Sequence, residues 1–343
     1  MTDTHVAGDH RPTIAVAMGD PAGISPELTA KLLALDEVRD AAHIVVYGDR
    51  RVLDAGARVA GVTLDIDVVA DDGAAPVPGA RPLLVDLAHL DPAQVEPGAA
   101  KAVGGAFALE NFRRALLLAH GGGAHAVVFT PFNKQAMRYV YPAYDDEIRY
   151  VADVTGFAGA AREFNILEGL WNARVTSHIP LSEVASSLSV ERIVAEMALT
   201  DACLRASGLA QPRIAVAGLN PHAGDGGNFG REEIDIIGPA VLAGVERGFN
   251  VSGPYPADTV FLRARGGAFD AVLTMFHDQG QIAMKLIGFD RGVTFMGGFP
   301  FPICTPAHGT AYDKVGQGVA HVGATLQAFL LAVRMARRAM APA

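Results

Sequence analysis

Three histidines in the sequence stand directly behind apolar segments of the kind that form buried β-strands. His178 ends ARVTSH, His222 lies in GLNPHAGDGG and His277 lies in MFHDQG. Neutral imidazole is the commonest nitrogen ligand of zinc, and a catalytic metal site usually has three protein ligands and one open position. A single histidine in such a turn is more often a hydrogen-bonding residue. Three at equivalent strand ends favour a metal site instead.

Other polar residues near these histidines could assist catalysis. Asp278 and Gln279, next to His277, could orient a metal ligand or a substrate hydroxyl. Asp258 in GPYPADTVF could serve as a general base or, equally, as an N-cap. Lys285 could pair with a substrate carboxylate or phosphate; otherwise it is a solvated lysine on the helix that follows.

The segment HGTAYDKVGQGVA (308–320) is the most informative of the glycine-containing stretches. No G-x-G-x-x-G follows the first apolar segment, so an ordinary Rossmann dinucleotide site is not expected. The segment resembles the adenosine-side loop of the isocitrate and isopropylmalate dehydrogenases, where an acid at the sixth position bonds to the ribose hydroxyls. Asp313 holds that position and would repel a 2′-phosphate, so NAD is favoured over NADP. The cofactor residues that this resemblance implies are His308, Gly309, Thr310, Ala311 and Asp313.

The elements that must position these residues can be predicted from the apolar pattern. Unbroken apolar segments predict strands covered on both faces, as in parallel sheets. Segments with helical spacing lie between them, for example 101–119 and 190–206. This alternation predicts an α/β fold, in which ligands bind beyond the carboxyl ends of the strands, so the polar turns should converge on one crevice. The predicted strands lie in segments 13–20, 43–49, 82–87, 126–134, 173–178, 213–222 and 270–280.

The composition excludes several classes of protein. A chain of 343 residues, 50% apolar and 19% charged, can form two lobes with a large core. The net charge of −9 disfavours nucleic acid or an anionic membrane as partner. Two cysteines cannot form a disulfide framework, and neither a secretion signal nor a membrane-spanning apolar run is found. We therefore expect a cytoplasmic protein that acts on a small molecule.

Taken together, the motifs resemble the 4-hydroxythreonine-4-phosphate dehydrogenase (PdxA) family. GDPAGISPE, TPFNK, TSHIPL, GLNPHAGDGG with GREEID, GPYPADT, FHDQG and HGTAYD occur in the family's order over nearly the whole chain. The resemblance implies a two-lobed α/β/α fold like that of isopropylmalate dehydrogenase, with mainly parallel sheets and an inter-lobe cleft. We assign residues 1–132 and 303–343 to an NAD-binding lobe, and residues 133–302 to a lobe for metal, substrate and dimerisation.

The same resemblance implies a homodimer in which His178, His222 and His277 hold a divalent metal. In the family, the third of these histidines comes from the partner subunit, so the active site would need both chains. Zinc is the expected metal, with magnesium, manganese or cobalt as alternatives.

The chain departs from the family at residues that recognise the substrate phosphate. Glu147 and Ile148 stand where the family has His-Thr. Thr294 replaces an asparagine and Ile303 replaces an arginine. A phosphate would lose a cationic donor and meet a carboxylate, which costs affinity through missing bonds and repulsion. Lys285 alone remains of the anion-binding set, so we expect a non-phosphorylated substrate.

The resulting prediction is an NAD-dependent, metal-dependent dehydrogenase that oxidises a secondary alcohol near a carboxylate. A cis-dihydrodiol carboxylate or a hydroxy acid would be such a substrate, and decarboxylation could follow. Asp258 would be the base and Lys285 would hold the carboxylate. The alternatives are the family's own reaction on a 4-phosphate for pyridoxal phosphate synthesis, a phosphate acyltransferase-like enzyme of the same broad fold, and a structural zinc that fastens the dimer.

Overall fold

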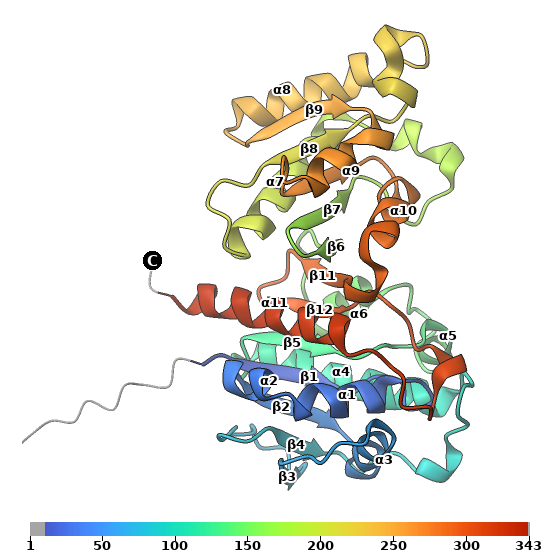
Figure 1. The fold of residues 1–343 in the computed structure, drawn as a ribbon, viewed down its shortest axis with the longest axis vertical. Coiled ribbons are helices and arrows are strands. Elements are labelled where there is room, and N and C mark those ends of the chain that lie inside the picture. The colour runs from blue at the N-terminus through green and yellow to red at the C-terminus, as the bar shows by residue number, and fades with distance from the viewer. Residues whose placement is uncertain (1–10, 342–343) are drawn as a thin grey trace, which may run out of the picture. The chain divides into compact units, whose positions relative to one another are not determined.

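The structure is a computed structural model that describes residues 11–341, and it divides into two compact units. Unit 1 comprises residues up to 145, 310–322 and those from 329 on; unit 2 comprises residues 146–309 and 323–328. The lobes predicted from the sequence were divided at 132/133 and 302/303, and the functions assigned to those lobes stay a prediction. Figure 1 labels the helices and strands of each unit.

Unit 1 contains a parallel sheet with the strand order β3-β4-β2-β1-β5. β1 pairs with β2 on one side and with β5 on the other, so β1 is a central strand. Its side chains from Ile14 to Ala17 are completely buried, as expected for a strand covered on both faces. The strands are β1 (Thr13–Ala17), β2 (His43–Gly48), β3 (Asp67–Ala70), β4 (Leu83–Asp86) and β5 (Ala126–Phe129).

Helices cover both faces of this sheet. In Figure 1, α1 and α2 lie in front of the strands of unit 1 and α4 lies behind them. α1 packs closely on α3, and the absence of a side chain at Gly56 permits this contact. A Cβ at Gly56 would lie 2.2 Å from the Pro26 carbonyl oxygen. The helices are α1 (Ser25–Ala34), α2 (Asp36–Ala41), α3 (Arg50–Ala60), α4 (Ala102–His120) and α5 (Lys134–Arg138), together with the part of α11 (Gly323–Met340) from residue 329 on.

Unit 2 contains a mixed sheet with the strand order β12-β11-β6-β7-β10-β8-β9. β7, β10, β8 and β9 run parallel, whereas β12, β11, β6 and β7 pair antiparallel. A two-residue turn joins β6 to β7, and Gly169 in that turn has φ +75°, as tight hairpin turns require. The strands are β6 (Arg162–Leu167), β7 (Leu170–Arg174), β8 (Ile214–Ala217), β9 (Val251–Tyr255), β10 (Ala271–Thr274), β11 (Val293–Gly297) and β12 (Ile303–Pro306).

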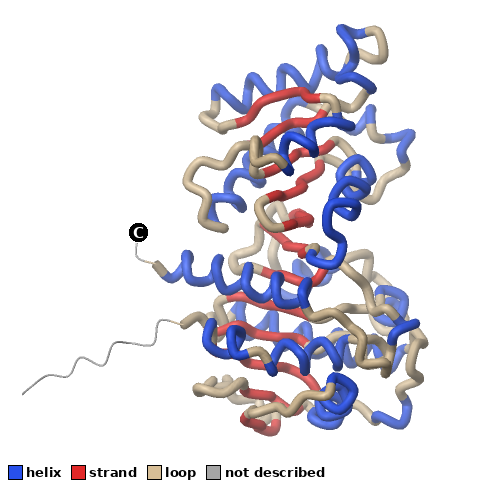
Figure 2. Tube along the Cα trace, in the orientation of Figure 1, coloured by secondary structure: helices blue, strands red, loops and turns tan. Residues whose placement is uncertain are grey.

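A side chain caps the start of α7, one of the helices of unit 2. Ser189 caps α7, since its side chain accepts a hydrogen bond from the Arg192 amide at 3.2 Å. In each unit, Figure 2 shows helices on both sides of the strands. The helices are α6 (Glu147–Thr155), α7 (Val190–Ala206), α8 (Gly238–Glu246), α9 (Ala257–Arg265) and α10 (His277–Gly288).

The predicted α/β class with mainly parallel strands is confirmed. Six of the predicted segments contain a strand, whereas segment 173–178 contains only the end of β7. The apolar pattern did not predict β6 and β11, because Glu163, Asn165 and Thr294 interrupt their apolar runs. No helix within residues 11–341 is both long and apolar enough to cross a membrane.

Candidate active site

Two of the three predicted metal ligands lie side by side in unit 2. Hydrogen bonds between the ends of β7 and β10 continue past the strands: the Val175 amide donates to Thr274 O at 2.8 Å, and the Thr176 amide and hydroxyl both donate to Met275 O, at 3.1 and 2.7 Å. The two chains therefore leave the sheet together. As a result, the ring centres of His178 and His277 are 5.8 Å apart.

Asp278 orients the ring of His277. Nδ1 of His277 lies 2.6 Å from Oδ1 of Asp278. A carboxylate on one ring nitrogen fixes the tautomer and directs Nε2 toward a ligand, which is the usual environment of a metal-binding histidine.

Gln279 connects the turn of His277 to the segment that carries His222. Its side-chain oxygen accepts a hydrogen bond from the Met275 amide, and its side-chain nitrogen donates to Gly218 O, both at 2.7 Å. Gly218 follows β8, and His222 lies four residues further on. Each end of the Gln279 amide bonds to the backbone, so Gln279 connects two loops; its contact with a ligand or substrate stays a prediction.

His222 lies in a left-handed turn. The residues from His222 to Gly226 all have positive φ, with values between +45° and +82°. Non-glycine residues in this region are strained, and His222, Ala223 and Asp225 are three of them. The His222 ring lies 6.0 Å from the ring of Phe229.

Glu233 holds the start of this strained turn. Its Oε1 accepts hydrogen bonds from the amides of Leu219 and Asn220, both at 2.7 Å, and its Oε2 accepts one from Asn220 Nδ2 at 2.9 Å. Glu233 is 5% exposed, so this carboxylate is satisfied by the turn it holds.

The three predicted ligands do not form a complete metal site in one chain. Within residues 11–341, no group of three or more His, Cys, Asp or Glu side chains could hold a metal ion. His178 and His277 meet, whereas His222 lies beside Phe229. The donors nevertheless fit a divalent cation in their chemistry, since two adjacent imidazoles and a carboxylate-oriented ring are characteristic of such sites.

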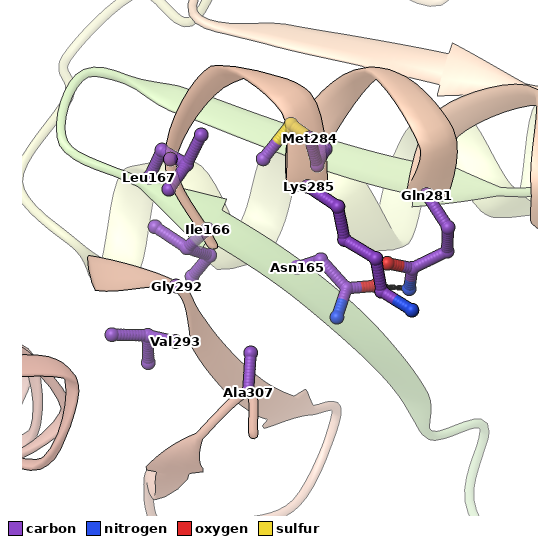
Figure 3. A pocket seen from close by; sticks show the side chains of 10 residues that line it. Asn165, Ile166, Leu167, Gln281, Met284, Lys285, Gly292, Val293 and Ala307 are labelled. Atoms are coloured by element: carbon purple, nitrogen blue, oxygen red, sulfur yellow. Dashed lines mark hydrogen bonds between the residues drawn. The ribbon is translucent and has the colours of Figure 1, made fainter. Parts of the chain in front are cut away.

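A polar network in unit 2 surrounds Asn165, as Figure 3 shows in part. Asn165 Oδ1 accepts hydrogen bonds from Arg174 Nη1 at 2.5 Å and from Gln281, and Asn165 Nδ2 donates to Thr294 Oγ1 at 3.4 Å. Arg174 also pairs with Glu163, with Nη2 and Oε2 2.9 Å apart. Thr294, predicted to face the substrate, is thereby joined to a buried cation that the sequence analysis did not identify.

Lys285 lies at a small cavity beside this network. Figure 3 shows its side chain directed to the same side of the cavity as those of Gln281 and Asn165. The volume of about 30 Å³ suits one or two water molecules and not a substrate. The lining residues are Asn165, Ile166, Leu167, Gln281, Met284, Lys285, Gly288, Gly292, Val293 and Ala307.

The remaining predicted substrate and base residues of unit 2 differ in accessibility. Glu147 is the first residue of α6 and, like Ile148, is half-buried; Ile303 is completely buried at the start of β12. Asp258 is exposed in the first turn of α9. The alternative role of Asp258 as an N-cap is wrong, because Pro256 holds that position and no side chain caps the helix.

The predicted cofactor loop is anchored in unit 1 by Asp20 and Tyr312. Tyr312 donates a hydrogen bond of 2.6 Å to Asp20 Oδ2, and Asp20 Oδ1 accepts one of 2.9 Å from the Ala22 amide. The Ile24 amide donates to Thr310 O at 3.0 Å. The turn after β1 therefore fixes the loop backbone, while Asp313 stays exposed to solvent.

Burial shifts the pKa values of both anchoring groups. Burial raises the pKa of Asp20, while the bonds from Tyr312 and the Ala22 amide act in the opposite direction. The pKa of Tyr312 is also raised, by burial and by its bond to Asp20. The hydroxyl therefore remains a donor at neutral pH.

Asp20, Arg174, Glu233 and Tyr312 were not identified as site residues from the sequence. Their partners are not neighbours along the chain: Asp20 and Tyr312 are 292 positions apart. Only residue type and motif could have pointed to two of them. Arg174 is a charged residue in a mainly apolar segment, and Glu233 belongs to the motif GREEID.

Replacing Tyr312 with phenylalanine is expected to destabilise the protein by about 1–3 kcal/mol at pH 7, because a buried carboxylate loses its donor. The pKa of Asp20 should rise further. Because the pKa of Asp20 is higher in the folded than in the unfolded protein, Asp20 stabilises the fold in its protonated form. This contribution is fully present below the unfolded pKa and is lost as the pH rises through the folded pKa. The destabilisation by Tyr312→Phe should therefore shrink as the pH falls. Urea unfolding over this range, with Tyr139→Phe at an exposed site as control, tests this; a pH-independent loss would contradict it.

Replacing Glu233 with glutamine should loosen the left-handed turn, because an amide NH₂ would face backbone donors. We expect a loss of about 1–3 kcal/mol in unfolding free energy. The control is Glu246→Gln, at an exposed carboxylate on α8. Equal stability of the two variants by chemical denaturation would show that Glu233 does not hold the turn.

Comparisons with known proteins agree with the resemblance seen in the sequence. A family model described as "Pyridoxal phosphate biosynthetic protein PdxA" matches residues 40–332. A relative from Rhizobium meliloti (strain 1021), named "Putative 4-hydroxythreonine-4-phosphate dehydrogenase 2", is 67% identical over 330 residues, which cover 96% of this chain and 95% of the relative.

Solved structures resemble the chain over a similar extent. A 4-hydroxythreonine-4-phosphate dehydrogenase from Klebsiella pneumoniae has a TM-score of 0.80 and 37% identity, covering 95% of this chain and 98% of that one. A terephthalate 1,2-cis-dihydrodiol dehydrogenase from Burkholderia xenovorans LB400 has a TM-score of 0.64 and 28% identity, covering 94% and 98%. The family model spans most of the chain, and the chain belongs to the PdxA family.

Proposed function

We propose that the chain is an NAD-dependent, divalent-metal-dependent dehydrogenase that oxidises a secondary alcohol of a small 4-phosphorylated hydroxy acid. The observation that carries the proposal is the 67% identity, over 96% of the chain, to a relative named for a 4-phosphate substrate. The non-phosphorylated substrate expected from the sequence has no support in that name. We therefore place the 4-phosphate first and keep the other as a second candidate.

Lys285 and Arg174 would attract the anionic substrate. Lys285 is exposed on α10 and could contact a phosphate or carboxylate directly. Arg174 is buried, so it would act through Asn165, which it contacts at 2.5 Å. Lys285 would compensate in part for the missing His-Thr and arginine of the family pattern, while the charge of Arg174 is already paired with Glu163.

His178, His222 and His277 would hold the divalent ion, with one imidazole supplied by a second copy of the chain. The bound ion would supply Lewis acidity toward the substrate alcohol. Asp278 would keep Nε2 of His277 directed to the ligand through its 2.6 Å contact with Nδ1. The exposed carboxylate of Asp258 is the candidate base for the hydroxyl proton.

The loop that contains His308, Gly309, Thr310, Ala311 and Asp313 would bind the adenosine half of NAD. The bonds from Ile24 and Tyr312 keep this loop in place without the cofactor. Asp313 is exposed and can accept hydrogen bonds from ribose hydroxyls, while its charge disfavours the 2′-phosphate of NADP.

A second copy of the chain would cover the exposed face of α10. Ile282 and Leu286 lie one helical turn apart on this helix and are 60% and 83% exposed. Large apolar side chains exposed together are typical of association surfaces. Because α10 begins at His277, a partner on this face would lie next to the proposed metal ligands.

A non-phosphorylated cis-dihydrodiol carboxylate is the second candidate substrate. Glu147 stands at a family phosphate position and would repel a phosphate, while Ile303 at another is buried and apolar. The structural neighbour named for a terephthalate dihydrodiol is consistent with such chemistry within this fold.

A matched pair of substrates separates the two candidates. We expect 4-hydroxythreonine 4-phosphate, with NAD and zinc, manganese or magnesium, to give NADH with a kcat/KM at least about a hundredfold above that of 4-hydroxythreonine, because the phosphate adds two or more charge-assisted bonds. The substitution Lys285→Ala should raise KM for the phosphorylated substrate, whereas Lys101→Ala, at an exposed site of unit 1, should not. Equal kcat/KM for both substrates, or turnover of a dihydrodiol carboxylate alone, would replace the first candidate by the second.

A further inference from the structure

Arg174 is a buried cation at the end of β7, just before the turn that leads to His178. The residue is 4% exposed, and its neighbours along the chain, Ala173 and Val175, are apolar and buried. A buried ion pair is often no more stabilising than apolar residues of the same volume, because both charges lose their hydration. The pairing of Arg174 with Glu163 is therefore an insufficient reason for an arginine here, and the directions of its other bonds matter.

The three nitrogens of the Arg174 guanidinium contact three different side chains. Nε donates to Ser177 Oγ at 2.7 Å, Nη1 donates to Asn165 Oδ1 at 2.5 Å, and Nη2 lies 2.9 Å from Glu163 Oε2. Asn165 and Glu163 lie on β6, whereas Ser177 directly precedes His178. A guanidinium holds its donors in a rigid planar fork, so it fixes the position of Ser177 relative to β6.

The same network reaches the helix that begins with His277. Asn165 Oδ1 also accepts a hydrogen bond from Gln281 Nε2, which Figure 3 draws as a dashed line. Gln281 lies on α10 four residues after His277, about one helical turn further along the same side of the helix. One oxygen of Asn165 is therefore bonded both to Arg174 and to the helix that carries His277.

These side-chain bonds act beyond the backbone bonds that join the two segments. The backbone bonds reach Thr176 and Met275, and each of the two histidines lies two residues further on. Each residue of a chain has two soft backbone dihedrals, so the backbone bonds alone do not fix the direction of either ring. The bond from Arg174 restrains Ser177, the residue between Thr176 and the first histidine.

We propose that Arg174 is a positioning residue of the candidate metal site. Its fork of donors holds Ser177 and Asn165 and thereby sets the orientation of His178 relative to His277. Arg174 would touch neither the metal nor the substrate, because its side chain is buried and directed to β6. The inference rests on the proposed function for its metal, whereas the restraint on the turn acts with or without a bound ion.

Cobalt(II) titration followed by visible absorption measures the effect of this restraint on the ligands. Arg174→Met keeps an unbranched side chain but removes the fork, and the affinity for cobalt should fall at least about tenfold. Arg174→Lys keeps the charge opposite Glu163 without the fork, so its affinity should stay as low as that of Arg174→Met. The control is Arg162→Met, which removes the 2.8 Å pair with the buried Glu196 in the same unit; it should lower stability and leave cobalt affinity unchanged.

Ser177→Ala tests the same bond without removing a buried charge, so it decides the matter if Arg174→Met does not fold. Its cobalt affinity should fall at least about threefold. Adding Ser177→Ala to Arg174→Met should weaken cobalt binding no further, because the bond between the two residues is already lost.

Hydrogen exchange of the metal-free proteins provides a readout that needs no metal. The segment 175–179 should exchange at least about tenfold faster in Ser177→Ala and Arg174→Met than in the unmodified chain, and unchanged in Arg162→Met. If the unmodified chain binds cobalt, equal affinity in Ser177→Ala, or full recovery of affinity in Arg174→Lys, would overturn the proposal. If it binds none, the proposed function fails by itself, and unchanged exchange in Ser177→Ala would then overturn the positioning role.

Discussion

The arrangement of the candidate active site depends on backbone hydrogen bonds that continue beyond the ends of two parallel strands. Thr176 bonds to Met275 O through both its amide and its hydroxyl, so the segments after β7 and β10 leave the sheet together. This pairing brings the ring centres of His178 and His277 to 5.8 Å, although Thr176 and Met275 are 99 positions apart along the chain. If these bonds were lost, the two rings would have no fixed relation to each other.

The third histidine is positioned in a different way. His222 belongs to a left-handed turn, which is unfavourable for residues with a side chain. Glu233 holds the start of this turn, and Gln279 connects the preceding residue Gly218 to the turn before His277. These hydrogen bonds offset the strain of the left-handed turn, and such an arrangement is common at functional sites.

The class of fold and the location of the three histidines after strands could be predicted from the sequence, because both depend on local patterns. Unbroken apolar runs indicate parallel strands that are covered on both faces, and a histidine soon after such a run lies near the carboxyl end of its strand. The antiparallel strands β6 and β11 were missed, because polar residues such as Asn165 and Thr294 interrupt them and then bond to each other inside unit 2. The bond between Asp20 and Tyr312 was likewise invisible, since no local pattern relates residues 292 positions apart. Long-range polar pairing is what the sequence alone did not reveal.

The most direct test of the account is cobalt(II) titration, followed by visible absorption, of the full chain and of three variants. We expect saturable binding with a ligand-field spectrum, weakened at least about a hundredfold in His178→Ala and His277→Ala and unchanged in His120→Ala, at the exposed end of α4. Cobalt binding of equal affinity in all four proteins would show that the paired imidazoles do not hold a metal, and would contradict the proposed active site.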